Sequence, residues 1–222
     1  MGHKRREVLC ILVSGGLDSA VLLHRLFQRG HRLVPVYVRC GFHWEPAELY
    51  WAKRFLHTLP RRGVSPIRVV TLPLRSVYGP HWSFTGHRIP GARSADAAVY
   101  LPGRNLMLLG AAAVVCAQHR GSRIALGTLR GNPFGDATPR FFTQMAACLS
   151  QALTYPIRVM TPLRHLHKSQ LIRAAAGLPL ELTFSCLDPQ GQRHCGRCNK
   201  CAERKRAFRA ARRVDPTSYA SR

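Results

Sequence analysis

The stretch "ILVSGGLDSAVLL", residues 11–23, joins an apolar run to a glycine-rich turn and then to a second apolar run. This pattern predicts a buried strand that ends at the turn and a helix that begins there. A helix N-terminus at the carboxyl end of a strand points unpaired N–H groups at bound anions. Gly15 and Gly16 let those amides approach closely, and Ser14 and Ser19 add hydroxyl donors. The sequence therefore predicts that the turn binds phosphate.

An acidic residue, Asp18, lies in the same turn. A carboxylate repels phosphate unless a cation stands between them, so Asp18 indicates Mg²⁺ bound together with the phosphates. The turn has neither the Lys-Ser/Thr pair of a Walker A loop nor the Gly-x-Gly-x-x-Gly of a dinucleotide site. A nucleotide's phosphates held in a different arrangement are the prediction, and a plain strand-to-helix connection is the alternative.

Strands and helices alternate along the rest of the chain. The predicted strands are 7–13, 33–38, 67–72, 123–127 and 157–160, and the predicted helices are 19–28, 46–59, 105–119, 141–153, 168–176 and 198–213. This alternation indicates an α/β fold, a doubly wound parallel five-stranded sheet with helices on both faces. The interval 73–99 has no sustained period, and we expect a long loop of the kind that often serves as a functional lid.

Four cysteines crowd into residues 186–201, "CLDPQGQRHCGRCNKC". They are Cys186, Cys195, Cys198 and Cys201. Cysteines two residues apart bind one metal from a tight turn, so this spacing predicts a tetrahedral site with one structural Zn²⁺ per chain. An iron–sulfur cluster is the alternative. We therefore expect two parts, a nucleotide-binding α/β domain over 1–180 and a zinc-binding segment with a basic helix over 181–222, the metal serving folding and not chemistry.

Residues near this cluster and the single cysteines have simpler interpretations. His194 adjoins the cluster, and we expect a surface residue or a substrate contact there. The basic run 204–206 is typical of a solvated helix face. The four remaining cysteines are expected to be buried as small apolar side chains; they are Cys10, Cys40, Cys116 and Cys148.

The charge balance is strongly basic, with 34 Lys and Arg against 10 Asp and Glu and a formal net charge of +24. Such a balance permits a nucleic-acid partner, but the basic residues are spread along the whole chain, as a general compositional bias toward Arg would leave them. Nucleic acid is therefore a possible but not a favoured partner, and we expect a small-molecule substrate. No stretch approaches the roughly 20 apolar residues that cross a bilayer. The apolar segment 8–13 is also too short for a secretory signal, so we expect a cytoplasmic protein without a membrane partner.

Taken together, these motifs resemble the QueC family, the 7-cyano-7-deazaguanine synthase branch of the PP-loop ATP pyrophosphatase superfamily. The turn matches the superfamily signature SGGxDS. Further anchors are "YLPGRNLMLL" at 100–109, "TPLRHLHKSQL" at 161–171, and "SC" at 185–186 followed by "CGRCNKC" at 195–201. The resemblance covers nearly the whole chain and implies an adenine nucleotide alpha hydrolase-like fold.

The resemblance also implies a function, an ATP-dependent carbon–nitrogen ligase of queuosine biosynthesis. Such enzymes convert 7-carboxy-7-deazaguanine and ammonia to 7-cyano-7-deazaguanine, with ATP as co-substrate and Mg²⁺, and family members often form homo-oligomers. The implied catalytic residues are Asp18, Arg104 and Lys168. The implied nucleotide-binding residues are Ser14, Gly15, Gly16, Leu17, Asp18, Ser19 and Asn105.

Two stretches depart from the family pattern. Residues 40–44, "CGFHW", stand where the family resembles Tyr-Gly-Gln-Arg-His. Residues 132–140 replace a Ser-Gly-Tyr-Pro-Asp-Cys-Arg-like run, with Asp136 and Arg140 standing in for its end. Both stretches are expected to border the substrate. Adenylation of another carboxylate or of a tRNA base therefore stays an alternative, as does a zinc-containing nucleic-acid-binding module without turnover, although that module would leave Asp18 unexplained.

Overall fold

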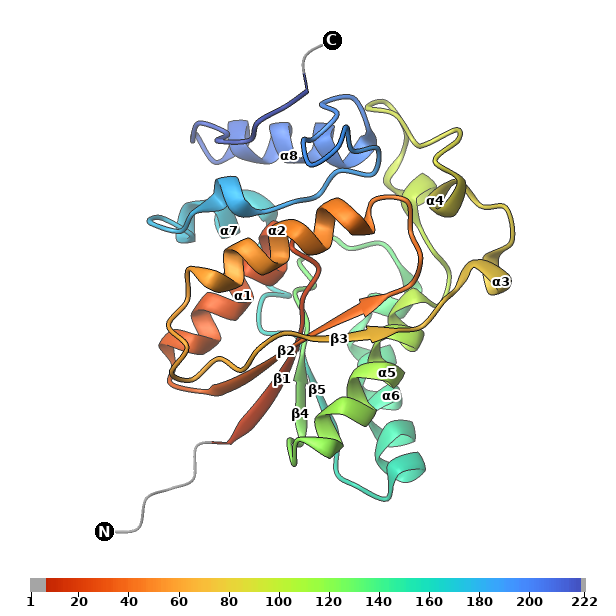
Figure 1. Cartoon of the computed structure of the whole chain (residues 1–222), viewed down its shortest axis with the longest axis vertical. Helices are drawn as coiled ribbons and strands as arrows, with labels where there is room; N and C mark the ends of the chain where they lie inside the picture. The colour runs from red at the N-terminus through yellow and green to blue at the C-terminus, as the bar shows by residue number, and fades with distance from the viewer. Residues whose placement is uncertain (1–6, 221–222) are drawn as a thin grey trace.

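A computed structural model describes residues 7–220, and Figure 1 shows a parallel sheet with helices packed on both faces. The strands are β1 Val8–Leu12, β2 Arg32–Arg39, β3 Arg68–Thr71, β4 Arg123–Ala125 and β5 Arg158–Met160. Their order is β3-β2-β1-β4-β5, and every pairing is parallel. The predicted α/β class and five-stranded parallel sheet are confirmed.

Six longer helices lie within a few residues of their predicted positions. They are α1 Leu17–Gln28, α2 Glu45–His57, α5 Arg104–Gln118, α6 Pro139–Leu153, α7 Lys168–Ala174 and α8 Asn199–Ala210. Helices α1, α2 and α7 pack on one face of the sheet, and α5 and α6 pack on the other, while α8 lies on α7 (Figure 1). Within residues 7–220, no helix has the length and apolar character of a membrane span.

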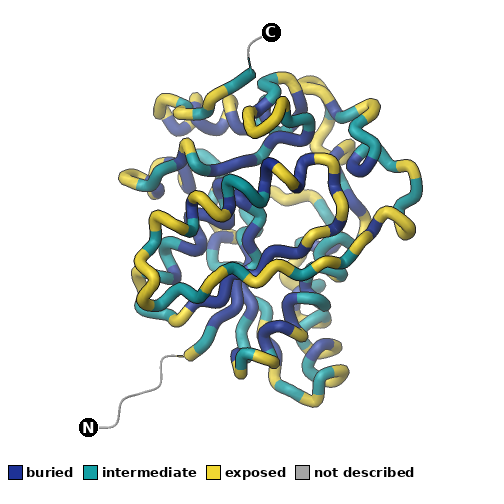
Figure 2. Tube along the Cα trace, viewed as in Figure 1, coloured by how far each residue is buried: buried dark blue, intermediate teal, exposed yellow. Residues whose placement is uncertain are grey.

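Strand β1 lies in the centre of the sheet and is covered on both faces. Leu9 and Ile11 join the apolar core under α1 and α7, whereas Cys10 joins the core under α5. All three side chains are fully buried, and Figure 2 shows long buried stretches in the central strands β1 and β2, whereas β3 is mostly exposed. Burial on both faces explains why this strand reads as an unbroken apolar run in the sequence.

The order of the strands also positions the ligand site. The chain adds β2 and β3 on one side of β1 and then crosses to add β4 and β5 on the other side. A crevice opens at such a reversal, beyond the carboxyl ends of the two strands that flank it. Gly127, just after β4, passes so close to α1 that a Cβ would lie 2.9 Å from the carbonyl carbon of Asp18. Glycine is therefore required at this point of the crevice.

The interval 73–99 is more ordered than expected. It contains α3 Arg75–Tyr78, α4 Trp82–Thr85 and the 3-10 helix η1 Asp96–Val99, so a loop without regular structure is wrong there. Elements of four residues are too short to show a period in the sequence. Asn199, at the start of α8, holds this interval in place. Its backbone N–H donates to the carbonyl of Pro90, and its side-chain amide donates to the carbonyl of Ser94.

Two expectations about polar residues near the cysteines are wrong in part, although Lys205 and Arg206 are exposed as expected. Arg204 is not on a solvated face: it is 1% exposed, and its guanidinium donates to Thr183 and contacts Asp215. His194 is not a surface residue: it is 4% exposed, its Nε2 accepts from the backbone N–H of Ser185, and burial lowers its pKa to about 3. Their partners lie at least nine residues away, so no local pattern could indicate this burial.

The single cysteines follow their prediction in three cases and depart from it in one. Cys10, Cys40 and Cys116 are buried, as expected for small apolar side chains. Cys148 is exposed on α6, so its predicted burial is wrong. The apolar face of that amphipathic helix is narrow, and Cys148 falls outside it beside the buried Leu149.

Replacing Gly15, in the turn before α1, is predicted to be more destabilising than replacing Gly30, which follows α1. Its φ is +68°, and a Cβ there would lie 2.8 Å from the carbonyl oxygen of Glu48, whereas Gly30, at φ +77°, has no atom within 4 Å of that position. Both alanine variants force a left-handed backbone, but only Gly15→Ala adds a clash. We expect urea denaturation to show an unfolding free energy roughly 1–3 kcal/mol lower for Gly15→Ala than for Gly30→Ala. Equal losses would contradict this account of the turn.

Candidate active site

A cavity of about 550 Å³ lies beyond the carboxyl ends of β1 and β4. Residues from five segments line it; those with charged or amide side chains are Asp18, Asp96, Arg104, Asn105, Arg130, Asn132, Asp136, Lys168, Lys200 and Glu203. A second hollow of about 180 Å³ adjoins it, shares Asp18 and Arg104 with it, and adds Ser14, Ser19 and Glu48. The structure thus brings the predicted residues Asp18, Arg104, Asn105 and Lys168 to one place.

The turn before α1 is ordered by its own hydroxyls. Ser19 Oγ donates to the carbonyl of Gly16 at 3.0 Å and accepts from the backbone N–H of Ser14 at 3.3 Å. The N-cap residue of α1 is Gly16, which has no side chain to cover the first amides of the helix. Those amides are therefore open to an anion. Leu17, also predicted to bind the nucleotide, has its side chain in the core, so only its backbone is available.

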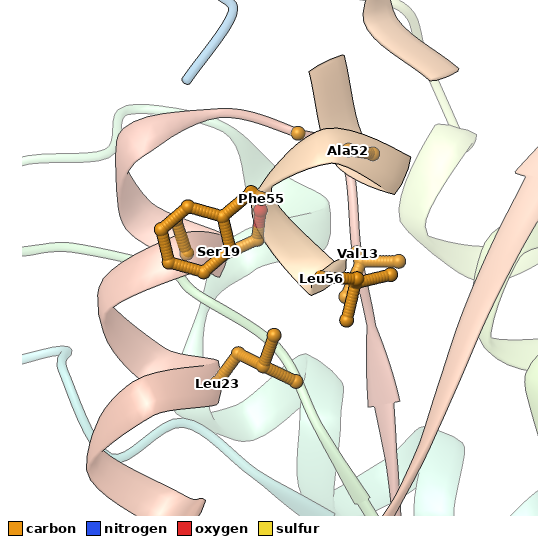
Figure 3. Close-up of a pocket in the computed structure, with 8 residues that line it drawn as sticks. Val13, Ser19, Leu23, Ala52, Phe55 and Leu56 are labelled. Atoms are coloured by element: carbon orange, nitrogen blue, oxygen red, sulfur yellow. The ribbon is translucent and has the colours of Figure 1, made fainter. Parts of the chain in front are cut away.

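A small apolar void lies on the other side of this turn, between α1 and α2 (Figure 3). Val13, Ser19, Leu23 and Phe55 are among the residues that surround it. Its volume of about 10 Å³ is close to the space of a single water molecule. A nucleotide cannot enter there, so the ligand space is the cavity that Asp18 lines.

An ionic network crosses the larger cavity. Lys168 Nζ lies 3.4 Å from Asp18 Oδ2 and 2.8 Å from Glu203 Oε1, and Lys200 Nζ lies 2.6 Å from Glu203 Oε2. Asp18 is the second residue of α1, Lys168 is the first residue of α7, and the other two residues lie in the first turns of α8. Two carboxylates and two ammonium groups from three helices therefore meet beside the turn.

The charges in this network depend on each other. Burial raises the pKa of Asp18 and Lys168 opposes that rise, while the other oxygen of Asp18, Oδ1, is buried without a hydrogen-bond partner among residues 7–220. Burial alone would lower the pKa of Lys168, but Asp18 and Glu203 outweigh it and raise that pKa. The unpartnered Oδ1 fits a carboxylate that is completed by a bound cation, because a buried lone oxygen is otherwise costly.

Arg104 and Asn105 begin α5 on the opposite wall. Asn105 is held in place, since its backbone N–H donates to Asp136 Oδ2 and its side-chain amide donates to the carbonyl of Asp136, both at 2.9 Å. The guanidinium of Arg104 lies 5.1 Å from the ring centre of Phe42, and its Nε is buried without a partner among the described residues. Arg104 is therefore available to an anion in the cavity.

Glu48, on α2, is a buried carboxylate that sequence analysis missed. It lines the smaller hollow, and Tyr37 donates to its Oε2 at 2.7 Å. Burial raises the pKa of Glu48 to about 7, although Arg104 and the Tyr37 hydroxyl oppose the rise and Glu45 adds to it. Residue 48 is an ordinary polar position of an amphipathic helix in the sequence, and only the approach of β2 and α5 buries it.

The four cysteines form a separate cluster. Their Sγ atoms all lie within 4.8 Å of one another, with 4.0 Å between Cys186 and Cys198 and 3.9 Å between Cys195 and Cys201. These separations are far too long for disulfides, and they suit four sulfurs about 2.3 Å from one central metal. Three of the sulfurs, those of Cys186, Cys195 and Cys198, accept hydrogen bonds from backbone N–H groups. The five donors are the N–H groups of Leu187, Asp188, Cys195, Arg197 and Cys198. Such donors stabilise thiolate charge, so the residues fit a metal site.

Sequence reasoning also missed Lys200 and Glu203 as residues of the cavity. Their signal is present in the sequence, because they stand on either side of Cys201 in "NKCAE". The cysteines drew attention to a metal site, whereas their neighbours face a different space, the 550 Å³ cavity. The two sites are thus joined through the first turns of α8.

Glu48→Gln is expected to alter the dependence of stability on pH. The pKa of Glu48 is higher in the fold than its ordinary 4.5, so its contribution to stability is complete below about pH 4.5 and is lost as pH rises through about 7. A rise from 4.5 to about 7 corresponds to about 3 kcal/mol. In urea denaturation from about pH 4.5 to 8, the wild type should lose about that much more unfolding free energy than Glu48→Gln. Parallel pH profiles would show that Glu48 ionises freely in the fold.

Comparison with known proteins finds relatives that match this chain along nearly its whole length. The sequence model of the queuosine biosynthesis protein QueC family matches residues 8–212. A 7-cyano-7-deazaguanine synthase from Methanopyrus kandleri is 32% identical over 94% of this chain and 97% of its own length. Another, from Sulfurimonas denitrificans, is 30% identical over 99% of this chain and 100% of its own length.

Solved structures share the fold at low identity. A predicted subunit of a tRNA methyltransferase from Methanocaldococcus jannaschii is 19% identical with a TM-score of 0.50, covering 77% of this chain and 74% of that one. A 4-thiouridine synthetase in complex with RNA and bound ATP is 16% identical with a TM-score of 0.50, covering 93% and 50%. Because the family model spans nearly all of the described residues, this chain belongs to the QueC family.

Proposed function

We propose that this chain is an ATP-dependent carbon–nitrogen ligase that converts 7-carboxy-7-deazaguanine and ammonia to 7-cyano-7-deazaguanine, a queuosine precursor. Relatives that align over nearly the whole chain carry the name of this synthase. The observation that carries the proposal is Asp18, which has a buried, unpartnered oxygen at a helix N-terminus and lines a cavity with Lys168 and Arg104. A plain strand-to-helix connection requires no such carboxylate.

The proposed chemistry requires two molecules of ATP for each nitrile. A carboxylate is a poor electrophile, so its oxygen first attacks the α-phosphorus of ATP and pyrophosphate leaves. Ammonia then attacks the acyl carbon, AMP leaves, and one proton is released, which gives the amide. The amide oxygen then attacks the α-phosphorus of a second ATP and a second pyrophosphate leaves, after which loss of AMP and of both amide protons gives the nitrile. Each half requires charge stabilisation at phosphate more than covalent help from the protein.

The residues of the cavity divide this work. Asp18 would hold Mg²⁺, which neutralises charge on the nucleotide's phosphates when bound. Ser14 and the first amides of α1 bind phosphate oxygens, and Ser19, whose hydroxyl donates to Gly16, orders the turn that presents them. Lys168 and Arg104 place positive charge where pyrophosphate departs, and Asn105 fixes the start of α5 beside them.

The far end of the cavity suits a planar heterocycle. Tyr100 and Phe134 line it as a stacked pair, with ring centres 4.6 Å apart and ring planes 14° apart. Flat aromatic faces of this kind pack well against a purine-like base. Asp136 lies beside them, buried and held by Asn105, as a hydrogen-bond acceptor for the N–H groups of such a base. Residues 132–140, which depart from the family pattern, belong to this end.

Asp18→Asn tests the proposal most directly. With ATP, Mg²⁺, ammonium and the deazaguanine acid, we expect pyrophosphate release from the wild type, with the nitrile identified by mass spectrometry. The variant keeps the shape of the side chain but loses the charge that holds the cation, so kcat/KM should fall at least about 100-fold. Glu181→Gln removes an exposed carboxylate outside the cavity and should leave the rate unchanged.

The same assay separates the alternatives. Pyrophosphate release that requires tRNA instead of the deazaguanine acid would point to tRNA modification. Tight RNA binding with no turnover of any small substrate would point to a nucleic-acid-binding module, with an affinity that falls steeply with salt. Either result would overturn the proposed reaction.

We also propose that the cysteine cluster holds one structural Zn²⁺ per chain. Four thiolates leave no open coordination position, so the metal would contribute folding free energy. Thiols kept for a metal and not for disulfides suit a reducing compartment, and the cytoplasm is the location we propose.

Metal analysis tests the cluster. We expect about one zinc per chain and a lower melting temperature after chelation. Cys198→Ser should lose the metal, whereas Cys148→Ser, which changes an exposed cysteine on α6, should keep it. An iron chromophore in the purified protein would contradict the assignment to zinc.

A further inference from the structure

Helix α8 begins inside the cysteine cluster, and its Lys200 side chain lines the neighbouring cavity instead of the cluster. Lys200 stands between Cys198 and Cys201, and successive helical side chains diverge by about 100°. Cys201 is buried in the cluster, whereas Lys200 lines the 550 Å³ cavity together with Asp18 and Lys168. The turn that gathers the sulfurs therefore also determines where this ammonium group lies.

Glu203 holds Lys200 and Lys168 side by side. Its Oε2 lies 2.6 Å from Lys200 Nζ, and its Oε1 lies 2.8 Å from Lys168 Nζ. An ammonium group has three donors; Lys168 uses two, on Glu203 and Asp18, and Lys200 uses one, so each lysine keeps at least one donor for another acceptor. An exposed pair three residues apart on a helix would contribute little. Here the Lys200 side chain is only 30% exposed and shares its carboxylate with a second lysine.

We infer that Lys200 is a phosphate ligand of the nucleotide, and that Glu203 is the positioning residue that holds it beside Lys168. This inference rests on the proposed function, because the anion it requires is the pyrophosphate portion of ATP. Asp18 and the first amides of α1 approach that group from one side, and the paired lysines approach it from α7 and α8. The cysteine cluster thereby acts on nucleotide binding, since it fixes the start of α8.

Direct binding of three ligands tests the role of Lys200. Lys200→Met keeps the apolar stem and removes the charge, so calorimetry with Mg²⁺ should show ATP and inorganic pyrophosphate binding at least about tenfold more weakly. AMP lacks the pyrophosphate portion, and its affinity should change by less than about twofold. Lys200→Arg restores a cation and should recover most of the ATP affinity.

Lys205→Met is the matched control on the same helix. Its ammonium donates to the carbonyl of Gly196 and lies 4.3 Å from the ring centre of Tyr219, outside the cavity. We expect ATP binding equal to that of the wild type, and all variants should keep their helical content and their bound metal. Glu203→Gln leaves both lysines without their shared carboxylate and should weaken pyrophosphate binding as well.

The outcomes separate this inference from the proposed function. ATP and pyrophosphate affinities that are unchanged in Lys200→Met would overturn the role of Lys200 while leaving the ligase reaction intact. An equal loss of AMP affinity would also overturn it, because it would show a general disturbance of the site. A wild type that binds none of the three ligands would overturn the proposed function, and this inference with it.

Discussion

An ion pair between Lys168 and Asp18 links the glycine turn before α1 to the C-terminal part of the chain. The two residues are 150 positions apart, and Lys168 in turn meets Glu203, 35 positions further on. A buried charge without a partner would be neutralised by proton transfer. The carboxylate at the turn therefore gains its ionic partners only when α7 and α8 have docked. The site is complete only in the complete fold.

Docking of α8 depends in turn on groups that are not part of the cavity. Asn199 is fully buried and holds the interval 73–99 through Pro90 and Ser94. Arg204 is buried one turn later, and its guanidinium donates to the carbonyl of Leu180 and to the hydroxyl of Thr183. Between these two anchors lie Lys200 and Glu203. A helix fixed at both points by directional bonds holds its charged side chains with little freedom, which favours preorganised binding.

The sequence alone predicts what depends on local pattern. The apolar run of β1, the glycine turn and the cysteine spacing are local, and each predicted element there matches the structure. In the sequence, Arg204 and His194 look like surface residues. Only folding brings Asp215 to Arg204 and Ser185 to His194. Glu48 was missed for the same reason, because a polar residue on a helix shows nothing of the wall that it will face. Lys200 was missed although its position beside Cys201 is visible in the sequence, because the cysteines indicated only a metal site.

The few acidic residues of this strongly basic chain are concentrated at the candidate site, and few of them lie on the surface. Of the ten Asp and Glu in the chain, five line the two cavities: Asp18, Glu48, Asp96, Asp136 and Glu203. Four others have structural partners, since Glu7 meets Arg123, Glu45 accepts from two backbone amides, Asp188 meets Arg197 and Asp215 meets Arg204. Exposed carboxylates contribute little to the free energy of unfolding. Having few of them therefore makes the net charge more positive at little cost in stability. The network at Asp18 instead balances two carboxylates against two lysines. That balance suits a nucleotide with its metal, whereas a groove for a polyanion would gather cations alone.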